Sequence, residues 1–104
     1  MKYDEDFLKK IVNFGILGYQ LNKIINILDI HEDDVNQFTE DFFNKNSAVG
    51  KAYQKGIDKA DFAIDTKLFD KAKEGDLKAL EKYEQRKKQY FKQELKEKIM
   101  QRKR

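Results

Sequence analysis

The sequence predicts an all-α protein with an N-terminal helix-turn-helix head followed by a long antiparallel helical hairpin. Charged residues make up 39% of the 104 residues, hydrophobic residues make up another 39%, and there is no proline. A high charge load without proline favours long helices with exposed polar faces. Apolar residues recur every three or four positions from residue 48 to residue 86, with a break only at Gly75-Asp76. The expected parts are a head over residues 1–46, a hairpin for oligomerisation over 47–95 and a basic tail over 96–104.

Three short helices are expected in the head. The first begins near Asp4, because acidic side chains suit a helix N-terminus, and it ends at Gly15 or Gly18. The second runs over about residues 19–28 and the third over about residues 32–43. The side chains expected to point inward are Phe7, Leu8, Ile11, Val12, Phe14, Leu21, Ile24, Ile25, Leu28, Val35, Phe38, Phe42 and Phe43.

The junction of the second and third helices has the apolar spacing of a helix-turn-helix. Two apolar residues end the second helix, Ile30 lies in the turn, and Val35 and Phe38 follow in the third helix. Asp29 stands in the turn where glycine is common, and aspartate tolerates the left-handed conformation better than most residues do. His31 occupies the N-cap position of the third helix. The turn is therefore expected to form without glycine.

Two long helices are expected to form the hairpin. Ser47 is the candidate N-cap of the first, which ends at Gly75, and Asp76 is the N-cap of the second. A two-residue connection makes the helices antiparallel neighbours. The apolar stripe of the first helix consists of Tyr53, Ile57, Ala60, Ile64, Leu68 and Ala72. The stripe of the second consists of Leu77, Leu80, Tyr83, Tyr90 or Phe91, Leu95 and Ile99.

These helices carry more aromatic side chains than one two-helix seam can cover. Apolar surface contributes about 25 cal/mol per Å² when it is buried, so the surplus favours association between copies of the chain. The alternative is packing of the stripe within the chain. The residues expected to form an oligomerisation seam are Tyr53, Ile57, Ile64, Leu68, Phe69, Leu80 and Tyr83.

Charge is distributed unevenly along the chain. Residues 1–50 carry five lysines and nine acidic residues, whereas residues 51–104 carry seventeen basic and ten acidic residues. A basic segment attracts phosphates or an acidic protein surface over long range, and the alternative is a solvated helix end. The net charge of +3 therefore conceals a basic C-terminal half.

The third helix is an unusual candidate for contact with DNA. A helix-turn-helix normally places its second helix in the major groove. The side chains that this helix is expected to expose are Glu32, Asp33, Asn36, Gln37, Glu40 and Asp41. The amides can bond adenine, but the carboxylates repel phosphates. The full set of candidate DNA-binding residues is Lys9, Lys10, Tyr19, Gln20, Asn22, Lys23, Asn36 and Gln37, and the alternative for them is an ordinary polar helix face.

No enzyme, metal or cofactor chemistry is expected. The chain has one histidine, no cysteine and no glycine-rich phosphate loop. The sequence pairs His31 with no serine or cysteine nucleophile in a recognisable arrangement. The acidic run 32–34 suits a helix N-terminus and needs no cation. A membrane span needs about 20 apolar residues, and the sequence has no such run and no signal peptide. We therefore expect no catalytic residue, no metal ligand and no membrane partner.

The pattern AYxKG…AD…K…AxxGDxxALxxYxxR, from Ala52 to Arg86, follows the helix-turn-helix. This order of parts resembles the small subunit of bacteriophage terminases over about residues 7–86. The resemblance implies a non-catalytic ring that recognises double-stranded viral DNA and delivers it to the large terminase subunit, which holds the ATPase and nuclease, in the cytoplasm of a bacterial host. Two alternatives remain: a prophage or plasmid transcription regulator that binds an operator as a dimer, and a helical protein-interaction module.

Overall fold

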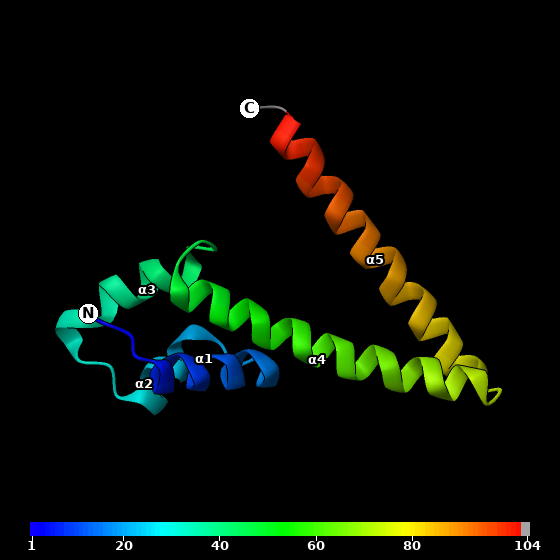
Figure 1. The fold of residues 1–104 in the computed structure, drawn as a ribbon, viewed down its shortest axis with the longest axis horizontal. Coiled ribbons are helices and arrows are strands. Elements are labelled where there is room, and N and C mark those ends of the chain that lie inside the picture. Colours follow the sequence, from blue (N-terminus) through cyan, green and yellow to red (C-terminus); the bar gives the residue numbers. More distant parts are fainter. Residues whose placement is uncertain (103–104) are drawn as a thin grey trace. The chain divides into compact units, whose positions relative to one another are not determined.

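The computed structural model describes residues 1–102, and these residues contain helices and no strand (Figure 1). The elements are α1 (Glu5–Leu17), α2 (Leu21–Leu28), the 3-10 turn η1 (Glu32–Asp34), α3 (Val35–Phe43), α4 (Ala48–Lys73) and α5 (Leu77–Arg102). The predicted all-α class is confirmed. The chain divides into a first unit, Met1–Phe62, and a second unit that begins at Ala63.

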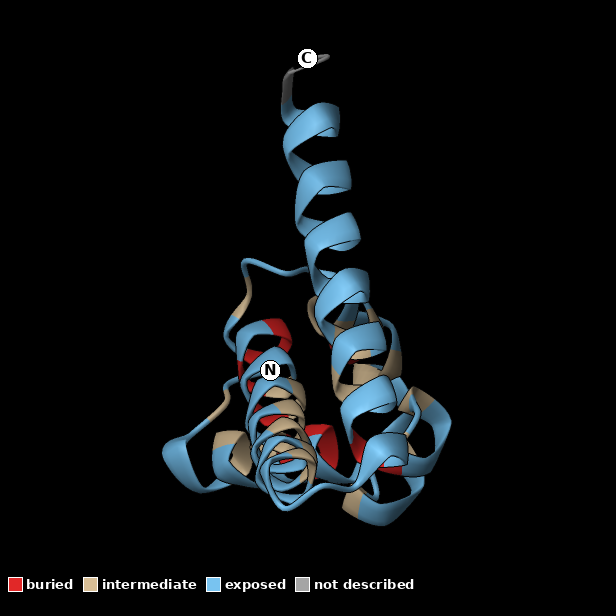
Figure 2. Cartoon of the chain, turned by 90° about the vertical axis from the view of Figure 1, so that its right-hand side faces the viewer, coloured by how far each residue is buried: buried red, intermediate tan, exposed pale blue. Residues whose placement is uncertain are grey.

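The first unit has one apolar core to which α1, α2, α3 and α4 all contribute. Phe38 of α3 is fully buried, and its ring lies 6.1 Å from Phe7 and 6.4 Å from Tyr3, centroid to centroid. Figure 2 shows the buried residues in red. The buried apolar side chains of this core are Ile11, Phe14, Ile24, Phe38, Val49 and Ala52. Because Val49 and Ala52 belong to α4, the unit extends beyond the expected boundary at residue 46.

Two glycines let α1 and α4 cross with their backbones in contact. A Cβ atom on Gly56 would lie 2.0 Å from the carbonyl oxygen of Val12 and 2.8 Å from the Cα atom of Gly15. A Cβ atom on Gly15 would lie 2.2 Å from the carbonyl oxygen of Tyr53. Real Cβ atoms do not approach backbone atoms this closely, so neither position accepts a side chain unless the helices move apart. Gly15 therefore lies inside α1, and Gly18, in the left-handed conformation with φ 70°, ends the helix.

The helix-turn-helix consists of α2, a short turn and η1 continued by α3. Asp29 ends α2 in the left-handed conformation with φ 52°, as the sequence predicts for a turn without glycine. The His31 Nδ1 atom accepts a hydrogen bond from the Asp33 backbone N–H at 3.1 Å, which confirms His31 as the cap. The third helix begins as the 3-10 turn η1 and becomes α-helical at Val35.

Two side chains of α3 lie differently from the sequence expectation. Phe43 was expected to point inward, but its side chain is 69% exposed, because Phe42 takes the inward position beside Phe38 and Tyr53. Asp41 was expected to be exposed, but it is half-buried and its Oδ2 atom accepts a 2.5 Å hydrogen bond from the Tyr3 hydroxyl. Burial, and then this hydrogen bond to a carboxylate, raises the pKa of the Tyr3 hydroxyl above its usual value.

The α4 helix begins as the sequence predicts. The Ser47 Oγ atom accepts a hydrogen bond from the Gly50 backbone N–H at 2.9 Å, which is the bond that defines a serine N-cap. The Ser47 hydroxyl also lies within hydrogen-bond distance of the Asn44 carbonyl oxygen, at 2.9 Å. The turn 44–47 is thereby tied to the first turn of α4.

The second unit is a helical hairpin made by the end of α4, a tight turn and α5. The turn is closed by backbone bonds from Gly75 to the Ala72 carbonyl, 3.0 Å, and from Asp76 to the Lys71 carbonyl, 3.1 Å. Gly75 has φ 100°, and the Asp76 Oδ1 atom accepts from the Ala79 backbone N–H at 3.0 Å. Both caps predicted at this turn are confirmed.

Two pairs hold α4 and α5 together near the turn. The Phe69 and Tyr83 rings lie 5.4 Å apart, and Asp65 forms a half-buried ion pair with Arg86. The register of these pairs shows that the helices run antiparallel. From Lys87 to Gln101 every residue of α5 is exposed (Figure 2). Residues 96–102 of the expected basic tail continue α5 as helix, and residues 103–104 lie outside the described residues.

Candidate nucleic-acid interface

Four of the predicted DNA-binding residues line one hollow at the corner between α1 and α2. The hollow has a volume of about 500 Å³. Its lining residues are Gly18, Tyr19, Gln20, Asn22, Lys23 and Asn26. Amides and one ammonium therefore surround a surface recess, and these groups donate hydrogen bonds to phosphate and sugar oxygens in protein–DNA complexes.

The N-terminus of α2 opens at this hollow without a side-chain cap. Gln20 holds the cap position in an extended conformation and makes no capping hydrogen bond. By contrast, Asp4, Ser47 and Asp76 each cap their helix with a side-chain oxygen. The first backbone N–H groups of a helix carry a partial positive charge and need an acceptor, so an uncapped N-terminus suits a phosphate oxygen.

Tyr19 lines the hollow and contacts Lys23, which also lines it. The Tyr19 ring stacks on Phe14 with centroids 5.9 Å apart, and the Tyr19 carbonyl accepts a 2.7 Å hydrogen bond from the Tyr53 hydroxyl. The Lys23 Nζ atom lies 4.2 Å from the centroid of the Tyr19 ring. This cation–π contact keeps the ammonium near the α2 N-terminus while it remains exposed to solvent.

The two lysines predicted on α1 do not join this hollow. Lys10 is exposed on α1, and Lys9 lines a different recess, between α1 and α4, together with Lys51 and Lys55. Spacing along α1 could not reveal this division, because it depends on how α1 packs against α4. Only Lys23 therefore provides a charge at the α1–α2 corner among the residues that line it.

The exposed face of α3 is acidic, as expected from the sequence. Asn36 and Gln37 are exposed, and the Gln37 side-chain amide donates to the Asp41 Oδ1 atom at 3.1 Å. The exposed carboxylates beside these amides are Glu32, Asp33 and Glu40. Such a surface repels phosphates, whereas the uncapped N-terminus of α2 attracts them.

The residues predicted for oligomerisation fall into three groups. Tyr53 belongs to the core of the first unit, where its ring lies 4.7 Å from Phe42. Ile57, Leu68 and Tyr83 are half-buried. The predicted seam residues with exposed side chains are Ile64 (47%), Phe69 (43%) and Leu80 (41%).

Three further apolar side chains on α5 belong with that exposed group. Phe91, Leu95 and Ile99 are 66%, 48% and 44% exposed. Their four-residue spacing places them in the apolar stripe of the sequence, and Phe91 belongs to the surplus of aromatic side chains that favours association, but none of the three was among the predicted seam residues. The second unit therefore exposes apolar side chains along both of its helices.

Residues 1–102 hold no cluster of three histidine, cysteine or acidic side chains arranged to bind a metal ion. Within the same range, no helix combines the length and apolarity that crossing a bilayer requires. Comparisons of the chain with known protein families, with curated proteins and with solved structures found no match.

Proposed function

We propose that this chain is a non-catalytic DNA-binding subunit that assembles into a ring through its second unit. Like the terminase small subunits it resembles, it would act in viral DNA packaging in the cytoplasm of a bacterial host. The observation that carries this proposal is the uncapped N-terminus of α2 within a helix-turn-helix, beside Asn22 and Lys23. The exposed apolar residues of the hairpin support self-association.

The proposed mechanism is avidity. One first unit offers few cationic groups to DNA, so a single copy binds double-stranded DNA weakly. Several copies in one ring place many such contacts on the same duplex, and each further contact becomes intramolecular. The ring then presents the DNA to the large terminase subunit, which supplies the ATPase and the nuclease.

A second candidate function follows from the acidic face of α3. Exposed Glu32, Asp33 and Glu40 suit a basic protein surface better than a polyanion, which favours a protein-interaction module. A dimeric transcription regulator is the remaining alternative. It requires a two-fold assembly and a palindromic site, whereas a ring accepts DNA without a palindrome.

We expect DNA binding that weakens steeply with salt. If six or more phosphates are contacted across the ring, affinity for a duplex falls by orders of magnitude between about 50 and about 200 mM salt, because bound counterions are released. Fluorescence anisotropy of a labelled duplex measures this dependence. An interaction module would bind no DNA even at about 50 mM salt.

The same titration locates the DNA surface. The variant Lys10→Ala, Lys23→Ala, which leaves the recess between α1 and α4 unchanged, should lower affinity, and it should reduce the salt dependence. Compared at protein concentrations at which light scattering gives the variant and the parent the same assembled mass, the variant Asp33→Asn, Glu40→Gln should bind DNA almost as the parent does at fixed low salt, because α3 does not face the DNA. Clear tightening by the second variant would instead make α3 the DNA-reading helix, since removing its carboxylates removes repulsion from phosphates.

A further inference from the structure

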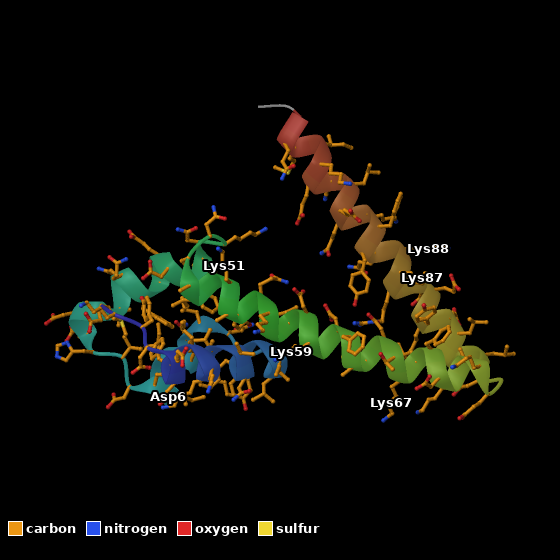
Figure 3. The ribbon with its side chains drawn as sticks, viewed as in Figure 1. Asp6, Lys51, Lys59, Lys67, Lys87 and Lys88 are labelled. Atoms are coloured by element: carbon orange, nitrogen blue, oxygen red, sulfur yellow. The ribbon has the colours of Figure 1, made fainter. Side chains whose placement is uncertain are left out.

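The recess between α1 and α4 is an apolar groove with a cationic rim. It has a volume of about 360 Å³ and lies within the first unit. The apolar residues that line it are Leu8, Val12, Ala48 and Ala52. Figure 3 shows Lys51 on the N-terminal part of α4, where it is one of the rim lysines. The Gly15–Gly56 crossing brings α1 and α4 together beside this shallow recess.

The rim of the groove carries a net positive charge. Lys9 comes from α1, whereas Lys51 and Lys55 come from α4 and lie four residues apart on one side of that helix. All three lysines are exposed, and Glu5 is the one acidic residue among those that line the groove. Such a groove fits an apolar side chain flanked by carboxylates.

The same unit presents a surface of that composition on α3. Asn36, Glu40 and Phe43 recur at four- and three-residue spacing and therefore share one side of the helix. Asp33 precedes them by three residues in η1. The Phe43 ring contacts the Phe42 ring edge-on, with centroids 5.2 Å apart, but its side chain is still 69% exposed, so this side of α3 offers an aromatic ring to solvent beside carboxylates.

We propose that the acidic side of α3, with Phe43 as its anchor, docks into the lysine-rimmed groove between α1 and α4 of a second copy of the chain. Both surfaces are exposed in the same folded first unit, so the α3 helix does not occupy the groove of its own chain. The two surfaces differ, which makes the contact head-to-tail, and a repeated head-to-tail contact builds a ring when the rotation between neighbouring subunits closes. The inference rests on the proposed self-association and adds a second contact between neighbouring subunits.

Charge reversal on each surface tests this contact in the full chain. Lys51→Glu with Lys55→Glu makes the groove acidic, and Asp33→Lys with Glu40→Lys makes the α3 surface basic. Each variant alone should raise the dissociation constant of the assembly about tenfold or more at low salt, because like charges then face each other. Light scattering over a dilution series measures the assembly. The matched control Lys59→Glu, Lys88→Glu changes the same charge on exposed lysines outside the groove and should assemble as the parent does.

An equimolar mixture of the two variants decides whether the two altered surfaces contact each other. In an equimolar mixture every contact can pair an altered groove with an altered α3, or an unaltered groove with an unaltered α3, so assembly should recover toward the parent value. Recovery also shows that both variants are folded. Failure of the mixture to recover, or assembly of either variant at the parent value, overturns the inference.

Two further outcomes separate this inference from the proposed function. If the parent assembles but the reversals lower only its affinity for DNA, the groove is a phosphate surface and the docking proposal is wrong, while self-association stands. If the parent remains a single chain at every concentration, the docking proposal and the proposed self-association both fail.

Discussion

Replacement of Gly56 by alanine is expected to destabilise the first unit by about 3 kcal/mol or more, which is the upper part of the range for overpacked cores. The added Cβ atom would lie 2.0 Å from the Val12 carbonyl oxygen and 2.8 Å from the Gly15 Cα atom. Both neighbours are backbone atoms, so no side-chain rotation relieves the overlap. The α1–α4 crossing must open, and the core that it closes must open with it. Urea unfolding followed by circular dichroism measures the effect.

The sign of the change in the free energy of unfolding distinguishes backbone overlap from helix propensity. In a helix interior, alanine is more favourable than glycine by about 0.5–1 kcal/mol, so helix propensity alone would predict stabilisation. The matched control is Ala63→Gly at an exposed position of the same helix, which should cost about that amount and nothing more. A Gly56→Ala protein as stable as the parent, or more stable, would show that the two helices do not meet at Gly15 and Gly56.

The double variant Leu68→Lys, Phe69→Lys is expected to turn the assembly into a helical monomer. Burying one leucine or phenylalanine side chain contributes about 1.5–3 kcal/mol. Because Leu68 is half-buried and Phe69 packs on Tyr83 in the same chain, about half of the summed amount, about 1.5–3 kcal/mol, is lost from each subunit contact, which raises the dissociation constant about tenfold or more. Light scattering measures the mass, and circular dichroism confirms that the helices remain.

A charge-matched control separates lost apolar contact from added charge. Ala63→Lys with Thr66→Lys adds the same two positive charges to α4 at exposed positions outside the apolar stripe. This control should keep the parent mass. If the Leu68, Phe69 variant also keeps the parent mass, this part of α4 is not the seam, and the exposed residues Phe91 and Leu95 of α5 become the next candidates.

The sequence predicted helix ends well because the signals for helix ends are local. Ser47 and Asp76 each bond a backbone N–H three residues later, and Gly75 and Asp29 each take the left-handed conformation within one turn of the chain. None of these bonds depends on a distant part of the molecule. Periodicity likewise identified Phe38 and Ile24 as inward-facing, and both are fully buried.

The features that the sequence did not predict all depend on packing between distant residues. Gly15 and Gly56 are 41 positions apart, and nothing in the local pattern says that they meet at a helix crossing. Asp41 was expected in solvent, but Tyr3, 38 positions away, donates to it. Phe43 points outward because Phe42 already fills the space beside Tyr53. The sequence did identify part of the lining of the α1–α2 hollow, because Gln20, Asn22 and Lys23 are neighbours in the chain.

The absolute mass of the full chain in solution shows whether the protein forms a ring. Light scattering over a range of protein concentrations distinguishes one chain, two chains and a larger closed assembly without any assumption about shape. A ring of subunits predicts one discrete mass of more than two chains that persists over a range of concentrations. A mass of one chain at every concentration would contradict ring assembly and the proposed function, because a single first unit offers too few phosphate contacts. A mass of two chains would favour the dimeric regulator instead.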